Sequence, residues 1–207
     1  MKKQNVQKGS IEEQIEIIKE TGVKPRLLLQ ACCGPCATSV LEYLVPYFDI
    51  TAYYYNPNTM PKEEFIRRLD SLKVAISHFD GVKLIVPEQD ESEFTSLVKG
   101  HEQDPEGGER CGICFALRLG KTAEYVASHK NEYDFFATTL TVSPYKNHKR
   151  INEIGEKIAE QYGVKYLSSN FKKRDGFLRS CRLADEFGLY QQVFCGCVYS
   201  KYDNKND

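Results

Sequence analysis

Cysteine is the residue type whose spacing in this chain points most directly to chemistry. Eight of the 207 residues are cysteines, too few for a disulfide scaffold, and clustered thiols in such a chain are typical of metal binding or redox work. Seven of them fall into three tight groups: Cys32, Cys33 and Cys36 in ACCGPCAT, Cys111 and Cys114 in ERCGICFAL, and Cys195 and Cys197 in VFCGCVYS. The eighth, Cys181, stands alone and is expected to be a small buried residue.

These thiols suit three kinds of chemistry. Cys33-Gly-Pro-Cys36 has the spacing of a thioredoxin-like dithiol reductase, but that chemistry leaves the other groups without a role. Structural zinc in an RNA-binding module would use Cys111-x-x-Cys114 as half of a four-thiolate site, although neither remaining pair has ordinary zinc spacing. A 4Fe-4S cluster accepts ligands from distant segments. Its four thiolate ligands would be Cys32, Cys33, Cys111 and Cys114.

The elements that must position these groups alternate between strand and helix. Apolar runs predict strands at 26–31, 50–55, 82–86, 133–140 and 164–168. Helical patterns occupy about 37–47, 63–79, 90–100, 111–129 and 148–162, and Ser10 with Glu13 has capping-box spacing at the start of an earlier helix. This alternation predicts an α/β fold with a doubly wound parallel sheet. The cysteine-bearing loops are then expected at the carboxyl ends of the strands, where ligands gather.

Length and hydropathy indicate one compact domain. With 41% hydrophobic residues the chain can bury a sizeable core, and we expect a tail and helix at 1–25, a single α/β catalytic domain at 26–200 and a polar tail at 201–207. No apolar run approaches the roughly 20 residues that span a bilayer, and the N-terminus is polar. We therefore predict a cytoplasmic protein with no membrane partner.

Charge is balanced overall but not locally. The formal net charge of −1 excludes a polycation held on nucleic acid by total charge alone. Residues 141–182, however, contain ten basic and four acidic side chains. Six of the basic residues are candidates for contacts with RNA phosphates: Lys146, Lys149, Arg150, Lys172, Lys173 and Arg174.

Four motifs, taken in order between residues 26 and 200, resemble the QueH family of epoxyqueuosine reductases. They are ACCGPC, EGGERCGICFALRL, TTLTVSPYKN and LYQQVFCGCVYS. The resemblance implies an enzyme that reduces the epoxide of epoxyqueuosine to give queuosine at the wobble position of a tRNA, without cobalamin. It also implies a fold related to the adenine nucleotide alpha hydrolases, the HUP-like class. The first loop, CCGPCAT, lacks the glycines and hydroxyls of a phosphate cradle, so we expect no ATP use.

The same resemblance assigns roles to the cysteines. It implies a 4Fe-4S cluster held by Cys32, Cys33, Cys111 and Cys114, with Cys195 and Cys197 as a redox-active disulfide pair. The single residue between that pair makes its disulfide strained and easily reduced, which suits electron relay. Family members often have Asp where this chain has Cys36, and both side chains can bind iron. We therefore expect Cys36 to help bind a second iron.

The implied reaction sets the remaining expectations. Removing an epoxide oxygen as water needs two electrons, protons and a Lewis acid that polarises the oxygen. An electron donor such as ferredoxin or flavodoxin would refill the cluster, and Tyr145 in SPYKN is a candidate proton donor. The expected substrate is the anticodon stem-loop of a tRNA that carries epoxyqueuosine, in which bases can be splayed out of the stack.

Overall fold

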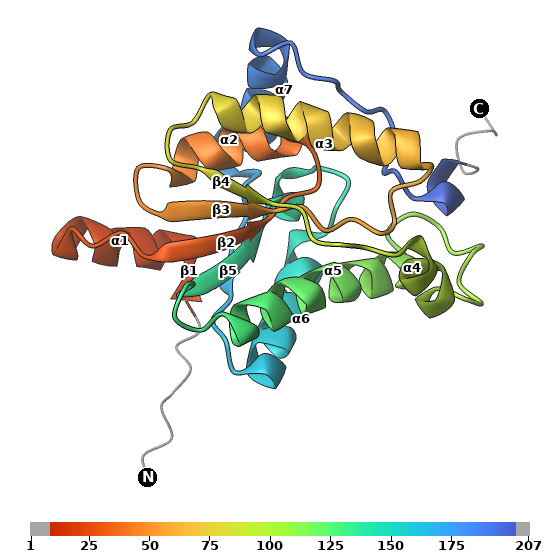
Figure 1. The fold of residues 1–207 in the computed structure, drawn as a ribbon, viewed down its shortest axis with the longest axis horizontal. Helices are drawn as coiled ribbons and strands as arrows, with labels where there is room; N and C mark the ends of the chain where they lie inside the picture. Colours follow the sequence, from red (N-terminus) through yellow and green to blue (C-terminus); the bar gives the residue numbers. More distant parts are fainter. Residues whose placement is uncertain (1–8, 202–207) are drawn as a thin grey trace.

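A parallel sheet lies at the centre of the molecule (Figure 1). The structure is a computed structural model that describes residues 9–201, so most of the two predicted tails, residues 1–8 and 202–207, lies outside the described residues. The strands run in the order β4–β3–β2–β5, and all neighbours are parallel. They are β2 (Arg26–Gln30), β3 (Asp49–Tyr53), β4 (Lys83–Ile85) and β5 (Phe135–Thr138).

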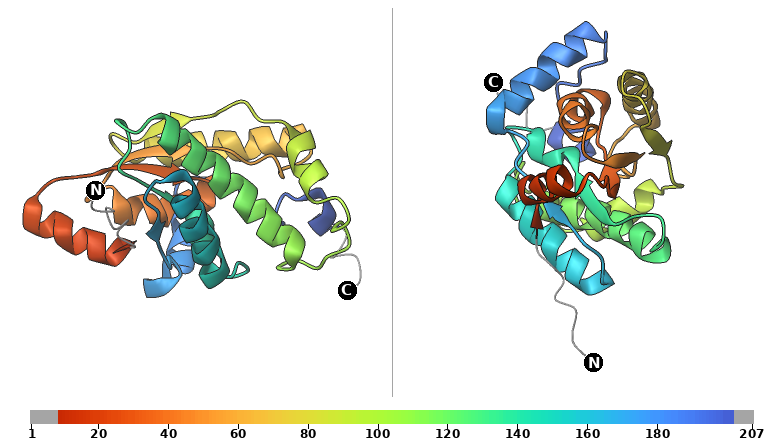
Figure 2. Two further views of the ribbon diagram at one scale, coloured as in Figure 1. Left: turned by 90° about the horizontal axis from the view of Figure 1, so that it is seen from below. Right: turned by 90° about the vertical axis from the view of Figure 1, so that its left-hand side faces the viewer.

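Helices cover both faces of this sheet (Figures 1 and 2). One face carries α2 (Gly34–Leu44), α3 (Lys62–Ser77) and α7 (Gly176–Glu186). The other carries α5 (Glu109–Ser128) and α6 (His148–Tyr162). Strand residues alternate between the two resulting cores, with Leu27 and Leu29 in one and Leu28 in the other. The predicted doubly wound parallel sheet is confirmed.

Two short strands extend the sheet beyond β5. Within the predicted strand 164–168, only β6 (Leu167–Ser168) is a strand, and Phe136 of β5 bridges Tyr166 just before it. β6 pairs in parallel with β1 (Gly9–Ser10), in residues that the sequence assigned to a tail. A two-residue pairing carries no periodicity of its own, because it depends on packing that only the folded chain supplies.

The helix after β1 confirms its predicted cap. In α1 (Ile11–Thr21), the Ser10 amide donates to Glu13 at 2.9 Å, and the Glu13 amide donates to Ser10 Oγ at 3.2 Å. Ile11, Ile15 and Ile18 pack into the same apolar cluster as the strand residues, so α1 shares the core of the domain.

The remaining elements are short. The predicted helix 90–100 is α4 (Glu91–Leu97), and three 3-10 turns complete the structure: η1 (Thr139–Val142), η2 (Lys173–Asp175) and η3 (Val198–Lys201). The helix predicted at 37–47 begins earlier, at Gly34, because Pro35 is well suited to a first turn. Cys36 therefore lies inside the helix. No helix among the described residues is both long and apolar enough to cross a membrane.

Candidate metal centre

The first cysteine group lies at the topological switch point of the sheet. β2 has β3 on one side and β5 on the other, and doubly wound folds bind ligands at the carboxyl ends of strands beside such a point. Residues 31–33 follow β2, Cys33 is the N-cap of α2, and Cys36 lies in the first turn. The predicted position of this group, in the loop at a strand's carboxyl end, is confirmed.

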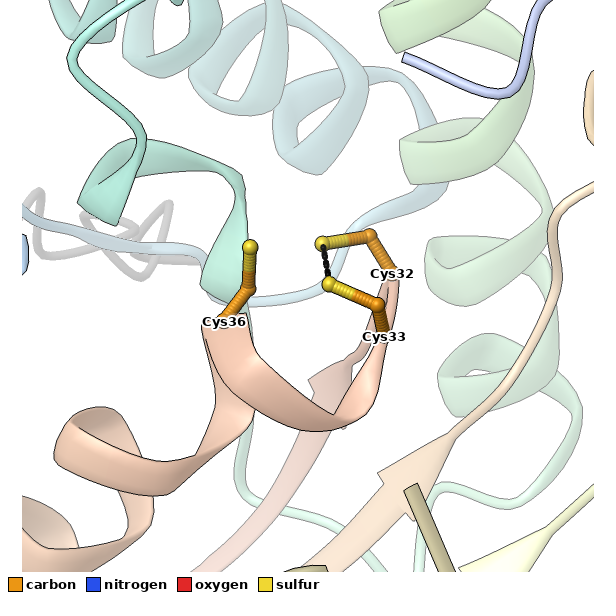
Figure 3. A group of neighbouring side chains, drawn as sticks. All are labelled: Cys32, Cys33 and Cys36. Carbon is orange, nitrogen blue, oxygen red and sulfur yellow. Dashed lines mark hydrogen bonds between the residues drawn. The ribbon is translucent and has the colours of Figure 1, made fainter. Parts of the chain in front are cut away.

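The three sulfurs of this group converge. The Sγ atoms of Cys32, Cys33 and Cys36 all lie within 4.8 Å of one another, and those of Cys32 and Cys33 are 3.6 Å apart (Figure 3). No other trio of Cys, His, Asp or Glu ligands is this close in the part of the chain that the structure describes. Three sulfur donors at this spacing fit a thiophilic metal such as iron or zinc.

Charge within the group concentrates on Cys32. Hydrogen bonds from the Cys33 and Cys36 thiols hold the pKa of Cys32 well below its usual range, and the cations Arg118 and Lys146 act in the same direction. The same pairing raises the pKa of Cys33 to about 12 and holds that of Cys36 well above its usual range. Cys32 is therefore the first of the three to exist as a thiolate, the form that binds metal ions.

Two polar side chains fix the sulfurs of the first loop. Thr139, which follows β5, accepts from the Cys32 amide at 3.3 Å and donates to Cys32 Sγ at 3.6 Å. Gln192, near the C-terminus, donates from Nε2 to Cys33 Sγ at 2.9 Å. The site is thus built from three segments that are distant in the sequence.

The second cysteine group stands on the first turns of α5. The Gly107 amide donates to Cys111 Sγ at 3.2 Å, and burial raises the pKa of Cys111. Cys114 is buried, and burial raises its pKa to about 12. Both residues line a cavity together with Cys195 and Cys197. In contrast to Cys32, these thiols are neutral as the protein stands.

The two cysteine groups face adjoining cavities. Cys32 and Cys36 line one, Cys111 and Cys114 line the other, and Cys195, Arg118 and Lys146 line both. The structure thus brings the predicted cluster ligands to one region, but it does not place Cys111 and Cys114 within the three-sulfur group. Ligands of different corners of a cluster need not be as close as ligands of one ion, so the donor set fits both a single metal and a cluster.

Arg118 joins the cysteine groups and was missed in the sequence. It is 2% exposed, and its Nη2 donates to Asn56 Oδ1 at 2.6 Å. Burial opposes its charge, but the sulfurs of Cys114, Cys32 and Cys195 hold its pKa above the ordinary value. The signal was available, since Arg118 follows Cys114 by one helical turn, on the buried face of α5.

The predicted disulfide between Cys195 and Cys197 is absent. All eight cysteines are free thiols. Helix α3 holds the loop that carries this pair, because its Arg68 donates to the carbonyl oxygens of Phe194 and Cys195 at 3.0 and 2.8 Å. Gly196 between them has φ 95° and packs against the same guanidinium. One intervening residue makes a disulfide ring too small to close without strain.

Comparison with known proteins now decides the family. The family model described as epoxyqueuosine reductase QueH matches residues 27–203, which includes every cysteine of the site. The chain belongs to the QueH family. The epoxyqueuosine reductase QueH of Streptococcus pyogenes serotype M1 is 38% identical over 195 residues, 92% of this chain and 76% of that protein. That of Staphylococcus epidermidis is 39% identical over 186 residues, 86% and 77% of the two chains.

Two further proteins are more distantly similar to the chain. The QueH protein of Thermotoga maritima is 32% identical over 182 residues and is covered to 92% of its length. A solved structure described as a predicted subunit of tRNA methyltransferase from Methanocaldococcus jannaschii shares 13% identity, with a TM-score of 0.46 over 77% of this chain and 76% of that one.

The basic residues of this QueH chain divide into two sets. Lys146 lines both cysteine cavities, and Arg150 donates to the carbonyl oxygens of Gly107 and Gly108 at 2.9 and 3.0 Å. These two cations are therefore committed to the site itself. Lys149, Lys172, Lys173 and Arg174 lie outside the cavity walls that carry the cysteines.

Three of the outer cations, Lys149, Lys172 and Lys173, create a positive surface beside the start of α6. Burial and then the charges of Lys172, Lys149 and Lys173 lower the pKa of His148 at the start of that helix. Tyr145 lies just before it on the cavity wall, with 78% of the residue exposed. The cysteine site therefore opens beside a surface suited to phosphate groups.

Proposed function

We propose that this chain is an iron-sulfur oxidoreductase that reduces epoxyqueuosine to queuosine at the wobble position of a tRNA. The observation that carries the proposal is the match to the QueH family across residues 27–203. The convergent thiols at the sheet switch point support it, because they supply a redox-capable donor set where such folds bind ligands. A bacterial tRNA-modifying enzyme of this kind works in the cytoplasm.

The proposed cofactor is a 4Fe-4S cluster on Cys32, Cys33, Cys111 and Cys114, with Cys36 binding a second iron. The Cys32 thiolate supports this assignment, as do the adjoining cavities that the two groups line. Arg118 and Lys146 would offset the negative charge that further thiolates bring into a buried site. When bound, the iron-sulfur group supplies single electrons and a Lewis acid.

The side chains around the cavities would bind and orient the substrate. Asn58 Oδ1 and Gln192 Oε1 belong to residues that line the Cys32 cavity, and both atoms are buried and accept no hydrogen bond from any described residue. Buried acceptors without donors are costly, so a hydroxyl-bearing ring that donates to them would bind favourably. Lys146 would stabilise negative charge that develops on the departing oxygen.

Proton and electron supply complete the reaction. Two electrons and two protons convert the epoxide to the alkene and water. Tyr145, on the exposed rim of the Cys111 cavity, is the proposed proton donor. An electron donor such as ferredoxin or flavodoxin is proposed to refill the iron-sulfur group. Cys195 and Cys197 are proposed to act at the reaction site as thiols, and Cys195 lines both cavities.

The outer cations would hold the anticodon stem-loop of the tRNA. Lys149 and Lys173 are exposed, and Lys172 donates to the Lys146 carbonyl at 2.5 Å, which keeps the outer surface close to the cavity. Phosphate contacts of this kind position an RNA without reading its sequence. Specificity for the modified base would then come from the cavity.

The test is direct reduction. Protein purified without oxygen is mixed with a stem-loop RNA that carries epoxyqueuosine and with reduced ferredoxin, and the nucleosides are identified by mass spectrometry. We expect queuosine to form, and omission of ferredoxin is the control. Unchanged epoxide in the presence of iron-loaded protein would overturn the proposal. In cells, deletion of the gene should leave tRNA in the epoxide form.

A further inference from the structure

A cavity of about 310 Å³ has no cysteine in its wall. It is bordered by the ends of β6 and β1 and by helices α2 and α7. We infer that it binds the base of one unpaired nucleotide next to the modified one. This inference rests on the proposed function, because it assumes an RNA substrate.

The wall has the chemistry that stacks bases. The guanidinium carbon of Arg174 lies 5.5 Å from the centre of the Tyr43 ring, and Phe171 meets Tyr43 edge-on at 6.4 Å. Proteins hold unstacked RNA bases on aromatic rings and on arginine planes. Asn170 also lines the cavity, and its Oδ1 accepts no hydrogen bond from any described residue. It is an acceptor for the amino group of a base.

The charges of the cavity favour a nucleotide. Arg179 pairs with Glu42 at 2.5 Å, and Lys173 with Glu12 at 3.4 Å, so these two cations brace the wall. Arg174 makes no ion pair with a described residue, and its charge remains for the ligand. An unpaired cation over an aromatic ring suits a base with its attached phosphate better than an uncharged apolar ligand.

The loop that carries Arg174 is built into an unusual conformation. Arg174 and Asp175 have φ values of 56° and 57°, in the left-handed region that side chains other than glycine rarely adopt. The next residue, Gly176, approaches its own chain so closely that a Cβ would lie 1.9 Å from the Phe171 carbonyl oxygen. Strained backbone of this kind clusters at binding sites, and here it presents Arg174 to Tyr43.

The spacing on α2 relates this cavity to the reaction site. Cys36, Ser39 and Tyr43 follow one another at three and four residues, so they share one helix face. Cys36 lines the cysteine cavity, whereas Ser39 and Tyr43 line the second one. At 1.5 Å per residue, Tyr43 lies about 10 Å along the helix from Cys36. A neighbouring nucleotide of one loop is the ligand that spans such a separation.

The experiment measures RNA binding apart from reduction. Iron-loaded protein is titrated into a fluorescently labelled anticodon stem-loop RNA and followed by anisotropy. We expect Tyr43→Ala and Arg174→Ala each to weaken binding by about 5- to 150-fold, the range for loss of one base stack, while Tyr43→Phe stays within about twofold. Arg67→Ala is the matched control, because Arg67 lies 3.7 Å over the Tyr190 ring outside the cavity.

A second RNA series identifies the ligand as a base. Stem-loops that lack one base next to the wobble position, on either side, are compared on wild type and Tyr43→Ala. We expect one of these abasic RNAs to bind wild type as weakly as Tyr43→Ala binds the intact RNA, with no further loss when the two changes are combined. The inference would be overturned if the losses of affinity from Tyr43→Ala and from each abasic RNA add when combined. It would also be overturned if Tyr43→Ala binds the intact RNA as tightly as wild type does. Wild type that binds RNA but reduces nothing would contradict the proposed reaction alone.

Discussion

The two cysteine groups on either side of Arg118 differ in geometry and in charge. In the loop after β2, three sulfurs lie within 4.8 Å of one another, and the pKa of Cys32 is held low. At the start of α5, the thiols line a cavity wall, and burial raises the pKa values of Cys111 and Cys114. The first group is arranged for a metal ion before one binds. Thiols with raised pKa values occur in both groups and must lose their protons as a metal binds; they are Cys33, Cys36, Cys111 and Cys114.

This difference indicates an order of assembly. We expect iron to bind first in the loop after β2, because three sulfurs already lie within 4.8 Å of one another there. Cys111 and Cys114 then close the site from the adjoining cavity. If the two groups act as one centre, loss of a ligand from either group should disturb the whole centre.

Replacement of Cys32 should have the largest effect. Cys32→Ser removes the one thiolate of the first loop, so bound iron and reductase activity should fall by more than about 100-fold, the upper range for loss of an outer partner of a metal. Iron per chain and the rate of epoxide reduction are the measurements. Cys181→Ser is the control, because Cys181 is a half-buried cysteine on α7, away from the site. Equal iron in both variants would contradict the account.

Replacement of Cys111 decides whether one centre spans both groups. If it does, Cys111→Ser loses acid-labile sulfide and retains at most about one of the roughly five irons. Iron and sulfide retained in full would show that the first loop holds the metal alone. Cys36→Ser should keep the sulfide and lose activity, because only the second iron depends on it. Full activity in that variant would exclude a role for Cys36.

Replacement of Arg118 should have an intermediate effect. Arg118→Ala removes a buried positive charge near sulfurs of both groups. The equilibrium constant for adding one electron to the centre should therefore fall by about tenfold or more. A redox titration followed by electron paramagnetic resonance measures this shift. Arg118→Lys keeps the charge and should restore most of the potential. An unchanged reduction potential in Arg118→Ala would show that Arg118 does not stabilise the reduced centre.

Much of this arrangement is readable in the sequence. Apolar runs located β2 to β5 because strands buried on both faces have no polar side, and the cysteine motifs placed their thiols in loops. β1 was missed because two residues carry no pattern. Gln192 and Asn58 were missed because their role depends on a cavity that only folding creates. Arg118 was overlooked although its spacing from Cys114 was visible.

Removal of an outer cation should have a small effect. Lys149→Ala should weaken binding of the stem-loop RNA a few-fold and reduce the slope of log affinity against log salt by about 1. Anisotropy titrations at several salt concentrations measure that slope. Lys130→Ala changes the net charge equally at an exposed position just past the end of α5, and it should leave the slope unchanged. Equal slopes for both variants would contradict a phosphate contact at Lys149.

The smallest signal is the single thiolate of the metal-free protein. The pKa of Cys32 is lowered, so its thiolate persists to lower pH than that of an ordinary cysteine and is lost as the pH falls through that lowered pKa. Thiolate absorbance near 240 nm at pH 7 should therefore drop in Cys32→Ser. It should not drop in Cys114→Ser, whose target thiol has a pKa of about 12. Equal absorbance in both variants would contradict the difference in pKa between Cys32 and Cys114.

The central claim is that thiols from the loop after β2 and from α5 hold one iron-sulfur centre. Its most direct test is analysis of iron, sulfide and zinc in protein purified without oxygen. We predict iron with matching sulfide, about four of each per chain plus a further iron, and no stoichiometric zinc. Stoichiometric zinc without sulfide would indicate a zinc-stapled RNA-binding module. Protein free of metal would indicate a dithiol reductase that uses Cys33 and Cys36, and either result would contradict the account.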